Sequence, residues 1–412
     1  MPTFRNDEAT SIYFDLNRNS IFKKQSLPKK GLDLLVLHVS EGCNLGCSYC
    51  FADKGQYGAK SVKWMDDAIA RKAIDFCYEK YEDLKAIKFF GGEPFLRMET
   101  VIDASRYSRK VSFDRGRGDP PALIAISNLT RYDSIVDTWI KEFSPSITAS
   151  IDGPAKIHDS FRIYPDGRGS FDLVDQNIKR MLSETGQPNV LECVYSPIHL
   201  QSGLTMIDVH KFLKERYEIQ HIIIHPMQGK KGIENISKFS YDKYVSSIYE
   251  LSLQYGKFLM LDTLMSMNSE SIRSRLSNII SGDFSADAHC GLGIHTITVQ
   301  ASGSISPCYT LIGKNEFEMG TISDNSSSKF ETVVQRLISN TKSENSICQA
   351  CSIQKTCHSC PGDMVITNGL INSPVTLTCD YLTGFCEGQI LAINQFRSTD
   401  QWDYFDKNIL NF

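Results

Sequence analysis

Residues 34–51 read LLVLHVSEGCNLGCSYCF, a short apolar run that leads directly into three cysteines. The run at 34–39 is too short for a typical helix and predicts a buried β-strand. Cys43, Cys47 and Cys50 follow with the spacing CxxxCxxC. They are therefore expected on the loop after the strand's carboxyl end, where βα barrels carry their catalytic groups. Three thiolates neither close a tetrahedral zinc site nor complete a cubane cluster, so one coordination position is left for another ligand.

The strand at 34–39 opens a repeating pattern. Further short apolar or β-branched runs occur at 86–90, 123–127, 146–151, 190–195 and 221–225. Amphipathic stretches that suit helices lie between them, for example at 65–81, 171–185 and 205–216. This alternation predicts an α/β fold with a parallel sheet, closed part of the way into a TIM-like (β/α)6 barrel.

Length and pattern divide the chain into four expected parts. Its 412 residues exceed the usual size of one hydrophobic core. The runs IYFDLN and SIFKK near the N-terminus suggest a hairpin around residues 17–19. We expect an N-terminal hairpin segment at 1–33, the barrel at 34–237, a helical linker at 238–289 and a cysteine-rich domain at 290–412.

Charge and hydropathy argue against several classes of partner. A formal net charge of −4 supplies no basic field for nucleic acid or an anionic membrane. No run approaches the roughly 18 apolar residues of a membrane span, and the polar start MPTFRNDEAT is unlike a secretory signal. We therefore predict a cytoplasmic protein. In that reducing compartment 13 cysteines favour metal ligation over disulfides.

A second group of cysteines fills the C-terminal part. Cys77 and Cys193 stand alone in apolar contexts and are predicted to be buried, inert thiols. The CxxC-x5-C core that begins at Cys348 is too regular for scattered core residues, and eight thiols suit two four-ligand sites. Spacing alone leaves zinc and iron–sulfur equally open. The eight are Cys290, Cys308, Cys348, Cys351, Cys357, Cys360, Cys379 and Cys386.

The run CNLGCSYCFADKGQYG resembles the signature of radical S-adenosylmethionine (SAM) enzymes, including the aromatic Tyr49 before the last cysteine. Its tail FADKGQYG is similar to the peptide-maturing branch of that superfamily. The resemblance implies a 4Fe-4S cluster whose unique iron binds the amino and carboxylate groups of S-adenosylmethionine, which one electron cleaves to a radical. The alternative is a zinc site with a fourth ligand such as His38.

Later segments resemble the family's cofactor-binding motifs. Gly91-Gly92-Glu93-Pro94 resembles its GGEP motif beside the cofactor's amino group, and two glycines allow a close backbone approach. The segment SITASIDGPAKIHDSFR resembles the one whose serine and arginine contact ribose and carboxylate, since an arginine fork suits a carboxylate. The residues implied to bind the cofactor are Tyr49, Gly91, Gly92, Glu93, Ser127, Asn128, Ser150 and Arg162.

Three further polar residues lie in or near these motifs. Asp152 either orients substrate or only serves the Asp-Gly turn. His158 and His225 are predicted to be structural.

The C-terminal cysteines resemble the SPASM domain, which implies two auxiliary 4Fe-4S clusters. Its pattern C-x12-G-x4-C is met by Cys290, Gly303 and Cys308. Two departures stand out: only two residues separate Cys357 from Cys360, and no cysteine follows Cys290 closely. The resemblance implies that Cys348, Cys351, Cys357 and Cys379 hold the cluster farther from the active site, and that Cys290, Cys308 and Cys360 hold the nearer one.

The nearer cluster is therefore expected to have an open iron, able to bind a substrate thiolate, unless Cys386 closes it. Cys386 follows Cys379 by two helical turns on the same face of an apparent helix, and it is otherwise buried packing.

The segments CVYSPIHL, IIIHPM and PCYTLIGKNEFEMGTI look like enzymes that crosslink ribosomally made peptides. This resemblance implies hydrogen-atom abstraction from a precursor peptide, followed by a thioether, C–C or C–O crosslink. It implies a leader and core peptide as substrate and an electron donor such as flavodoxin or ferredoxin. The leader is expected to bind through the N-terminal hairpin, the barrel or a separate recognition protein.

Two alternatives remain open. The first is a sulfatase maturase, which oxidises cysteine or serine to formylglycine. That family places an aspartate base after the cysteine of the G-x4-C segment, whereas Tyr309 stands here, and tyrosine is a poor base at neutral pH. The second is a non-catalytic iron–sulfur or zinc protein, against which the cofactor motifs argue.

Overall fold

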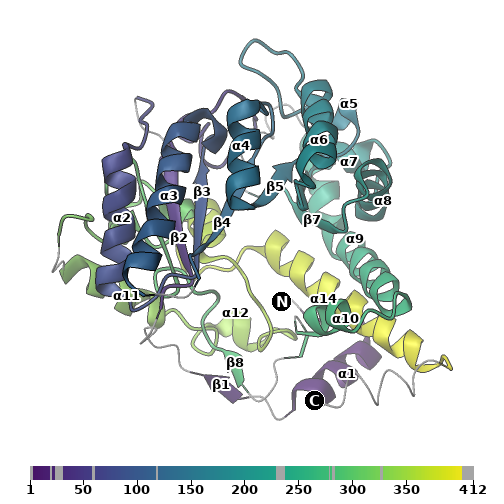
Figure 1. Ribbon diagram of the computed structural model, residues 1–412. Helices are drawn as coiled ribbons and strands as arrows, with labels where there is room; N and C mark the ends of the chain where they lie inside the picture. The colour runs from purple at the N-terminus through teal and green to yellow at the C-terminus, as the bar shows by residue number, and fades with distance from the viewer. Residues whose placement is uncertain are drawn as a thin grey trace.

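The computed structural model describes residues 3–18, 21–23, 31–57, 61–116, 119–228, 237–277, 279–280, 284–324 and 328–400. Its centre is an eight-stranded sheet in the order β10-β9-β2-β3-β4-β5-β6-β7 (Figure 1). All neighbours from β9 to β7 run parallel. The six predicted strands are confirmed as β2 (Leu34–Ser40), β3 (Ala86–Gly91), β4 (Ala122–Ser127), β5 (Ser146–Ser150), β6 (Val190–Tyr195) and β7 (His221–Pro226).

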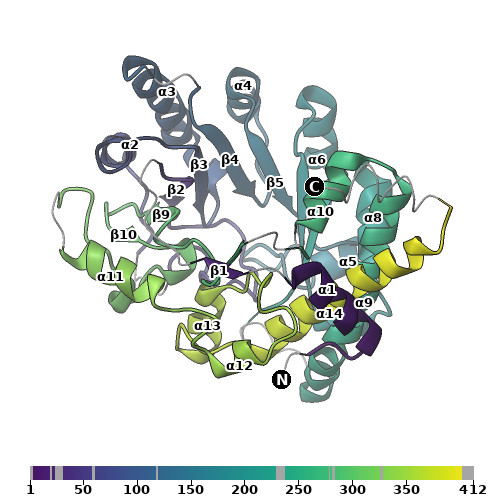
Figure 2. The same cartoon turned by 90° about the horizontal axis from the view of Figure 1, so that it is seen from below.

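Helices that follow the strands cover one side of this sheet. Figure 2 shows α2, α3, α4 and α6 on that side, as βαβ crossovers require. Shorter helical turns η1 (Pro94–Arg97), α5 (Ala155–His158) and α7 (Pro197–Gln201) lie in the connections. The longer helices are α2 (Asp67–Lys80), α3 (Met98–Asp114), α4 (Ser134–Phe143), α6 (Phe171–Thr185) and α8 (Met206–Tyr217).

Alternation along the strands separates the core from the barrel interior. Leu35, Leu37 and Val39 of β2 join the main hydrophobic core. Successive side chains of a strand point to opposite faces, so the residues between them face the interior. In β6, Leu191 and Cys193 lie in that core, which directs Glu192 inward.

The cysteine-rich part continues the same sheet. Strand β9 (Thr296–Val299) pairs parallel with β2, and β10 (Ile305–Ser306) pairs antiparallel with β9. Of the elements that follow, α11, α12, α13 and α14 lie in Figure 2 on the side of the sheet opposite α2, α3 and α4. In chain order the elements after β10 are η2 (Tyr309–Leu311), η3 (Asn315–Phe317), α11 (Ser328–Ile338), α12 (Ser346–Gln349), α13 (Pro361–Asn368) and α14 (Thr376–Arg397).

The long helix α9 (Lys238–Met265) packs along α14 and is followed by α10 (Ser269–Leu276). Glycine permits the close approach of α9 and α14. A Cβ on Gly388 would stand 1.9 Å from the Leu253 carbonyl oxygen, and one on Gly256 would stand 2.2 Å from that of Phe385. The described part of the chain contains no helix of the length and apolar character that a membrane crossing requires.

The expected N-terminal hairpin is wrong. Residues 7–17 form helix α1 (Asp7–Asn17), capped by the Asn6 side chain, which accepts a hydrogen bond from the Ala9 amide. Ala9, Ile12 and Tyr13 are buried on one face, a helical spacing that the short run IYFDLN obscures. Strand β1 (Ile21–Lys23) pairs with β8 (Phe284–Ala286), far along the chain. The division into four domains stays a prediction.

Candidate active site

The cysteine loop and the Gly-Gly-Glu segment are joined through their backbones. The Gly92 amide donates to the Ser40 carbonyl at 2.8 Å, and the Glu93 amide donates to that of Gly42 at 3.0 Å. A Cβ on Gly91 would stand 2.1 Å from the Ser40 oxygen, and one on Gly92 would stand 2.3 Å from the Gly42 oxygen. Only glycine fits at these positions without a shift of the loop that carries the first three cysteines.

Glu93 ties two predicted cofactor residues to this loop. Its carboxylate accepts hydrogen bonds from the Ser127 hydroxyl (2.8 Å), the Asn128 amide (2.8 Å) and the Phe95 amide (3.0 Å). Burial raises the pKa of Glu93, and these hydrogen bonds oppose that rise. The Asn128 side-chain amide in turn reaches the Cys43 sulfur at 3.5 Å. The carboxylate is thus held by protein donors at the edge of the cysteine loop.

Tyr49, Arg162 and Asp152 form a second chain of contacts. Arg162 Nη1 donates to the Tyr49 hydroxyl at 2.8 Å, and that hydroxyl donates to Asp152 Oδ2 at 2.5 Å. Asp152 Oδ1 accepts the Val194 amide at 3.1 Å. Arg162 Nε is buried without a hydrogen-bond partner among the described residues. A buried guanidinium N–H that lacks an acceptor fits a site for a ligand carboxylate.

One cavity of about 240 Å³ is lined by Glu93, Ser127 and Asn128 of the first contact chain and by Tyr49, Arg162 and Val194 of the second. Every residue predicted for the catalytic cluster and for S-adenosylmethionine lines it. Their individual roles stay predictions. These residues are Cys43, Cys47, Tyr49, Cys50, Gly91, Gly92, Glu93, Ser127, Asn128, Ser150 and Arg162.

The three cysteines assigned to the nearer cluster also lie together. Burial, with a smaller contribution from the charge of Cys308, raises the pKa of Cys290 to about 12 and that of Cys360 to about 11. Cys308 Sγ accepts from the Thr310 hydroxyl at 3.3 Å, and Cys360 Sγ accepts from the Asp363 amide at 3.4 Å. Asp363 lines the 240 Å³ cavity, so this group borders the same space.

The four cysteines assigned to the farther cluster line a separate small cavity: Cys348, Cys351, Cys357 and Cys379. Cys386 is 5% exposed and packs in the apolar cluster that Cys351 and Cys357 adjoin. Burial raises its pKa, and so do the charges of Cys351 and Cys357. Cys386 therefore lies beside the farther group, and the suggestion that it closes the nearer cluster does not suit this arrangement.

The thiols suit a cluster better than a single ion. Each iron of a cubane takes one thiolate, so cluster ligands stand farther apart than the ligands of one zinc ion. Within the described ranges, no three His, Cys, Asp or Glu side chains converge on a point where one metal ion would sit. His38 is buried with both ring nitrogens lacking a described partner, and it packs against Tyr57. His38 is not among the residues that line the cavity of Cys43, Cys47 and Cys50, which does not favour it as their fourth ligand.

Two residues of the cavity were not predicted as functional. His225 was expected to be structural and Glu192 was not considered, yet both line the cavity, with His225 Nε2 3.1 Å from Glu192 Oε1. The sequence did contain a signal for Glu192. It is a charged residue inside the apolar run VLECVY, and it alternates with the core residues Leu191 and Cys193. His158, in contrast, accepts the Asp152 amide at 3.3 Å and contacts Ser170 at 3.0 Å, as a structural residue would.

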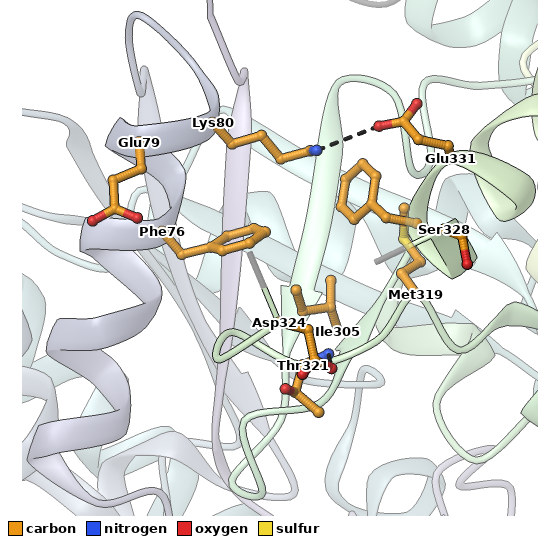
Figure 3. Close-up of a pocket in the computed structure, with 10 residues that line it drawn as sticks. Phe76, Glu79, Lys80, Ile305, Met319, Thr321, Asp324, Ser328 and Glu331 are labelled. Atoms are coloured by element: carbon orange, nitrogen blue, oxygen red, sulfur yellow. Dashed lines mark hydrogen bonds and ion pairs between the residues drawn. The ribbon is translucent and has the colours of Figure 1, made fainter. Parts of the chain in front are cut away.

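A larger hollow of about 520 Å³ lies between α2 and α11 (Figure 3). Phe76, Glu79 and Lys80 line it from α2, and Lys80 pairs with Glu331 at 3.5 Å. None of the predicted site residues borders it. It is therefore separate from the candidate active site.

Comparison with known proteins agrees with the fold. Residues 37–215 match the model of the Radical SAM superfamily. The chain is 21% identical over 347 residues to the cysteine-type anaerobic sulfatase-maturating enzyme of Clostridium novyi (strain NT), covering 80% of this chain and 87% of that enzyme. The structure of native anSMEcpe with bound AdoMet superimposes with a TM-score of 0.68 at 20% identity, covering 89% of this chain and 100% of that chain.

Streptococcus suis SuiB bound to its precursor peptide SuiA is less similar. Its TM-score is 0.50 at 14% identity, covering 82% of this chain and 74% of that chain. The predicted α/β partial barrel with a cysteine-rich C-terminal region is confirmed. The comparisons favour the sulfatase-maturing alternative over peptide crosslinking, which the sequence motifs had placed first.

Proposed function

We propose that this radical SAM enzyme, whose cofactors are S-adenosylmethionine and 4Fe-4S clusters, oxidises a cysteine side chain of a peptide or protein substrate. The single observation that carries the proposal is the shared cavity. The first three cysteines line it, and so do Tyr309 and Asp363 next to the nearer C-terminal cysteines. Hydrogen-atom removal and electron acceptance would then take place around one bound side chain.

The chain's own residues divide this work. Cys43, Cys47 and Cys50 would hold a cluster with one open coordination position, and Arg162 Nε would donate to the cofactor's carboxylate. S-adenosylmethionine, when bound there and given one electron, supplies the radical that removes a hydrogen atom. The auxiliary clusters would accept the remaining electron. Because the chain is a radical SAM enzyme, the alternative of a non-catalytic iron–sulfur or zinc protein is not supported.

Formylglycine formation is one product that this reaction class allows. The match to the cysteine-type anaerobic sulfatase-maturating enzyme of Clostridium novyi covers 80% of this chain. The anSMEcpe structure was also solved with a bound Kp18Cys peptide. Those names support a cysteine-bearing peptide as the substrate. In this product, oxidation of the cysteine is followed by exchange of sulfur for oxygen.

A thioether crosslink is the second product. Tyr309 stands where sulfatase maturases place an aspartate, and its ring packs against that of Phe90 at a tilt of 36°, with ring centroids 4.3 Å apart. Burial raises the pKa of Tyr309, so its hydroxyl stays protonated at neutral pH and is not available to accept a proton. The nearer cluster has three thiols at hand, which would leave an iron for a substrate thiolate. A precursor peptide with leader and core, an external electron donor and a separate leader-recognition protein belong to this version of the proposal.

The test is anaerobic reconstitution with iron, sulfide, S-adenosylmethionine and dithionite. Two substrates are compared, a sulfatase-derived cysteine peptide and a cysteine-bearing precursor peptide. We expect 5′-deoxyadenosine together with a peptide that has lost two hydrogens, either with its sulfur retained or with its sulfur also replaced by oxygen, as read by mass spectrometry. A fully iron-loaded enzyme that cleaves S-adenosylmethionine but leaves every cysteine peptide unchanged would refute the proposal.

A further inference from the structure

Two titratable side chains face the cavity from neighbouring strands. Glu192 comes from β6 and His225 from β7, and His225 Nε2 lies 3.1 Å from Glu192 Oε1. The strand register sets His225 opposite Val194, so the pair is diagonal across the two strands. About 29% of the Glu192 side chain and 33% of the His225 side chain is accessible, and both line the cavity. The accessible surface is therefore open to whatever binds there.

The other two carboxylates that line this cavity, Glu93 and Asp363, accept hydrogen bonds from protein donors, and so does Asp152 beside Tyr49. Glu93 accepts three hydrogen bonds, and Asp152 accepts the Tyr49 hydroxyl and the Val194 amide. Asp363 accepts the Thr378 hydroxyl at 2.6 Å and the Thr367 hydroxyl at 3.0 Å. Each of these carboxylates thus already accepts two or three hydrogen bonds from the protein, whereas Glu192 is held by His225 alone among the described residues.

We propose that His225 accepts the proton which the substrate thiol loses on oxidation, and that Glu192 is the positioning residue that orients the imidazole. With Nε2–H donated to Glu192, the second nitrogen, Nδ1, is the acceptor. Nδ1 has only a long contact of 3.5 Å with the Pro226 carbonyl. The arrangement follows the logic of a carboxylate that holds a histidine base in one tautomer.

Charges around the pair support these roles. Burial by itself lowers the pKa of His225, but the hydrogen bond and charge of Glu192, with a contribution from Asp152, raise it above the usual value. Burial raises the pKa of Glu192, but His225, Lys88 and Arg162 outweigh it, so this carboxylate stays ionised. A histidine base with a pKa near the working pH is well suited to proton transfer.

The inference rests on the proposed function, and its step balances. The substrate loses one hydrogen atom from carbon to the radical derived from S-adenosylmethionine, one electron to an auxiliary 4Fe-4S cluster, and one proton from sulfur to His225. One C–H bond and the S–H bond break, and either a C–S crosslink or a C=S bond forms in their place. The same acceptor therefore serves both products named above.

The test uses the anaerobically reconstituted enzyme with its peptide and compares His225→Gln and Glu192→Gln with the wild type. His221→Gln is the matched control, because His221 is an exposed residue of the same strand. We expect product per 5′-deoxyadenosine to fall on the order of 100-fold in His225→Gln. Iron content and peptide Kd, measured by fluorescence anisotropy, should stay at wild-type values. An unchanged product ratio in His225→Gln would overturn the inference.

The pH profile separates positioning from packing. Neutral His225 is the active form, so product formation rises with pH through its pKa. Without the Glu192 charge this pKa falls, and the rising limb should move to lower pH in Glu192→Gln. A rising limb that stays at the same pH in Glu192→Gln would overturn the role of Glu192. This comparison remains decisive even if the His225→Gln variant fails to load iron. If the wild type forms no peptide product at all, the proposed function fails instead.

Discussion

Arg162 donates one guanidinium hydrogen bond to the Tyr49 hydroxyl at 2.8 Å and keeps its buried Nε without a partner among the described residues. Tyr49 belongs to the cysteine loop, whereas Arg162 follows β5. The bond therefore joins two distant segments at the wall of the cavity. An unpaired N–H in such a place is costly unless a ligand completes it.

Replacing Arg162 by lysine should weaken S-adenosylmethionine binding by about tenfold, because an ammonium cannot reproduce the planar fork. Equilibrium dialysis of the iron-loaded protein measures the Kd. Arg168→Lys is the control, since Arg168 is exposed and pairs with Asp166. Equal affinity in the two variants would contradict a role for Arg162 in cofactor binding.

Gly92→Ala should prevent the protein from retaining the catalytic cluster. The new Cβ would stand 2.3 Å from the Gly42 oxygen, and the backbone on both sides would have to move. Gly46→Ala is the matched control in the same loop, because its Cβ would meet neighbours only at 3.7 Å or more. We expect the iron and sulfide content of Gly92→Ala, but not that of Gly46→Ala, to fall by the amount that one cluster holds. Equal iron content in the two variants would contradict the close approach of Gly92 to the Gly42 carbonyl.

Cys379→Ala and Cys386→Ala should differ in iron content. Cys379 lines the small cavity with Cys348, Cys351 and Cys357, whereas Cys386 is buried in the adjoining apolar cluster. We expect Cys379→Ala to lose or destabilise the farther cluster and Cys386→Ala to keep its iron. Iron quantitation with electron paramagnetic resonance measures both. Loss of iron in Cys386→Ala would make that thiol a ligand.

Cluster loading should strengthen as pH rises. Burial raises the pKa of Cys43 to about 12 and that of Cys47 to about 11, so both thiols are protonated at neutral pH without metal. Each thiolate ligand then releases a proton on binding. Competition with a chelator at pH 7 and pH 8.5 should show tighter retention of iron at the higher pH, and equal retention would contradict protonated thiols.

The same raised pKa values predict the opposite trend for the metal-free chain. A thiol whose folded pKa lies above its unfolded value of about 9 stabilises the folded state below that pH. This contribution is lost as the pH rises above about 9. Thermal denaturation of the apo chain should therefore give a lower Tm at pH 10 than at pH 8. A Tm that does not fall over this interval would argue against buried thiols.

The sequence predicted the barrel well because its signals are local. Each of the six strands is a short apolar run, and the motif residues follow the strand ends at which parallel sheets gather them. The helix at Asp7–Asn17 was missed because its run IYFDLN alternates over a few residues, while the buried face defined by Ala9, Ile12 and Tyr13 follows a longer period.

Other features depend on contacts between distant segments. The diagonal pair of Glu192 and His225 requires the register of β6 against β7, which a single sequence does not contain. The place of Cys386 depends on how α14 packs, since helical spacing puts it on the face of Cys379 but not at a particular cluster. The pairing of β9 with β2 is likewise invisible to local patterns.

That last pairing means that the C-terminal region is no detachable module. Strand β9 covers the edge of β2, the strand that leads into the first three cysteines. A chain cut before residue 290 would expose the backbone edge of β2 at residues 34–37, and an uncovered apolar edge strand invites aggregation. Truncated versions of this protein should accumulate as insoluble material rather than as a smaller active barrel.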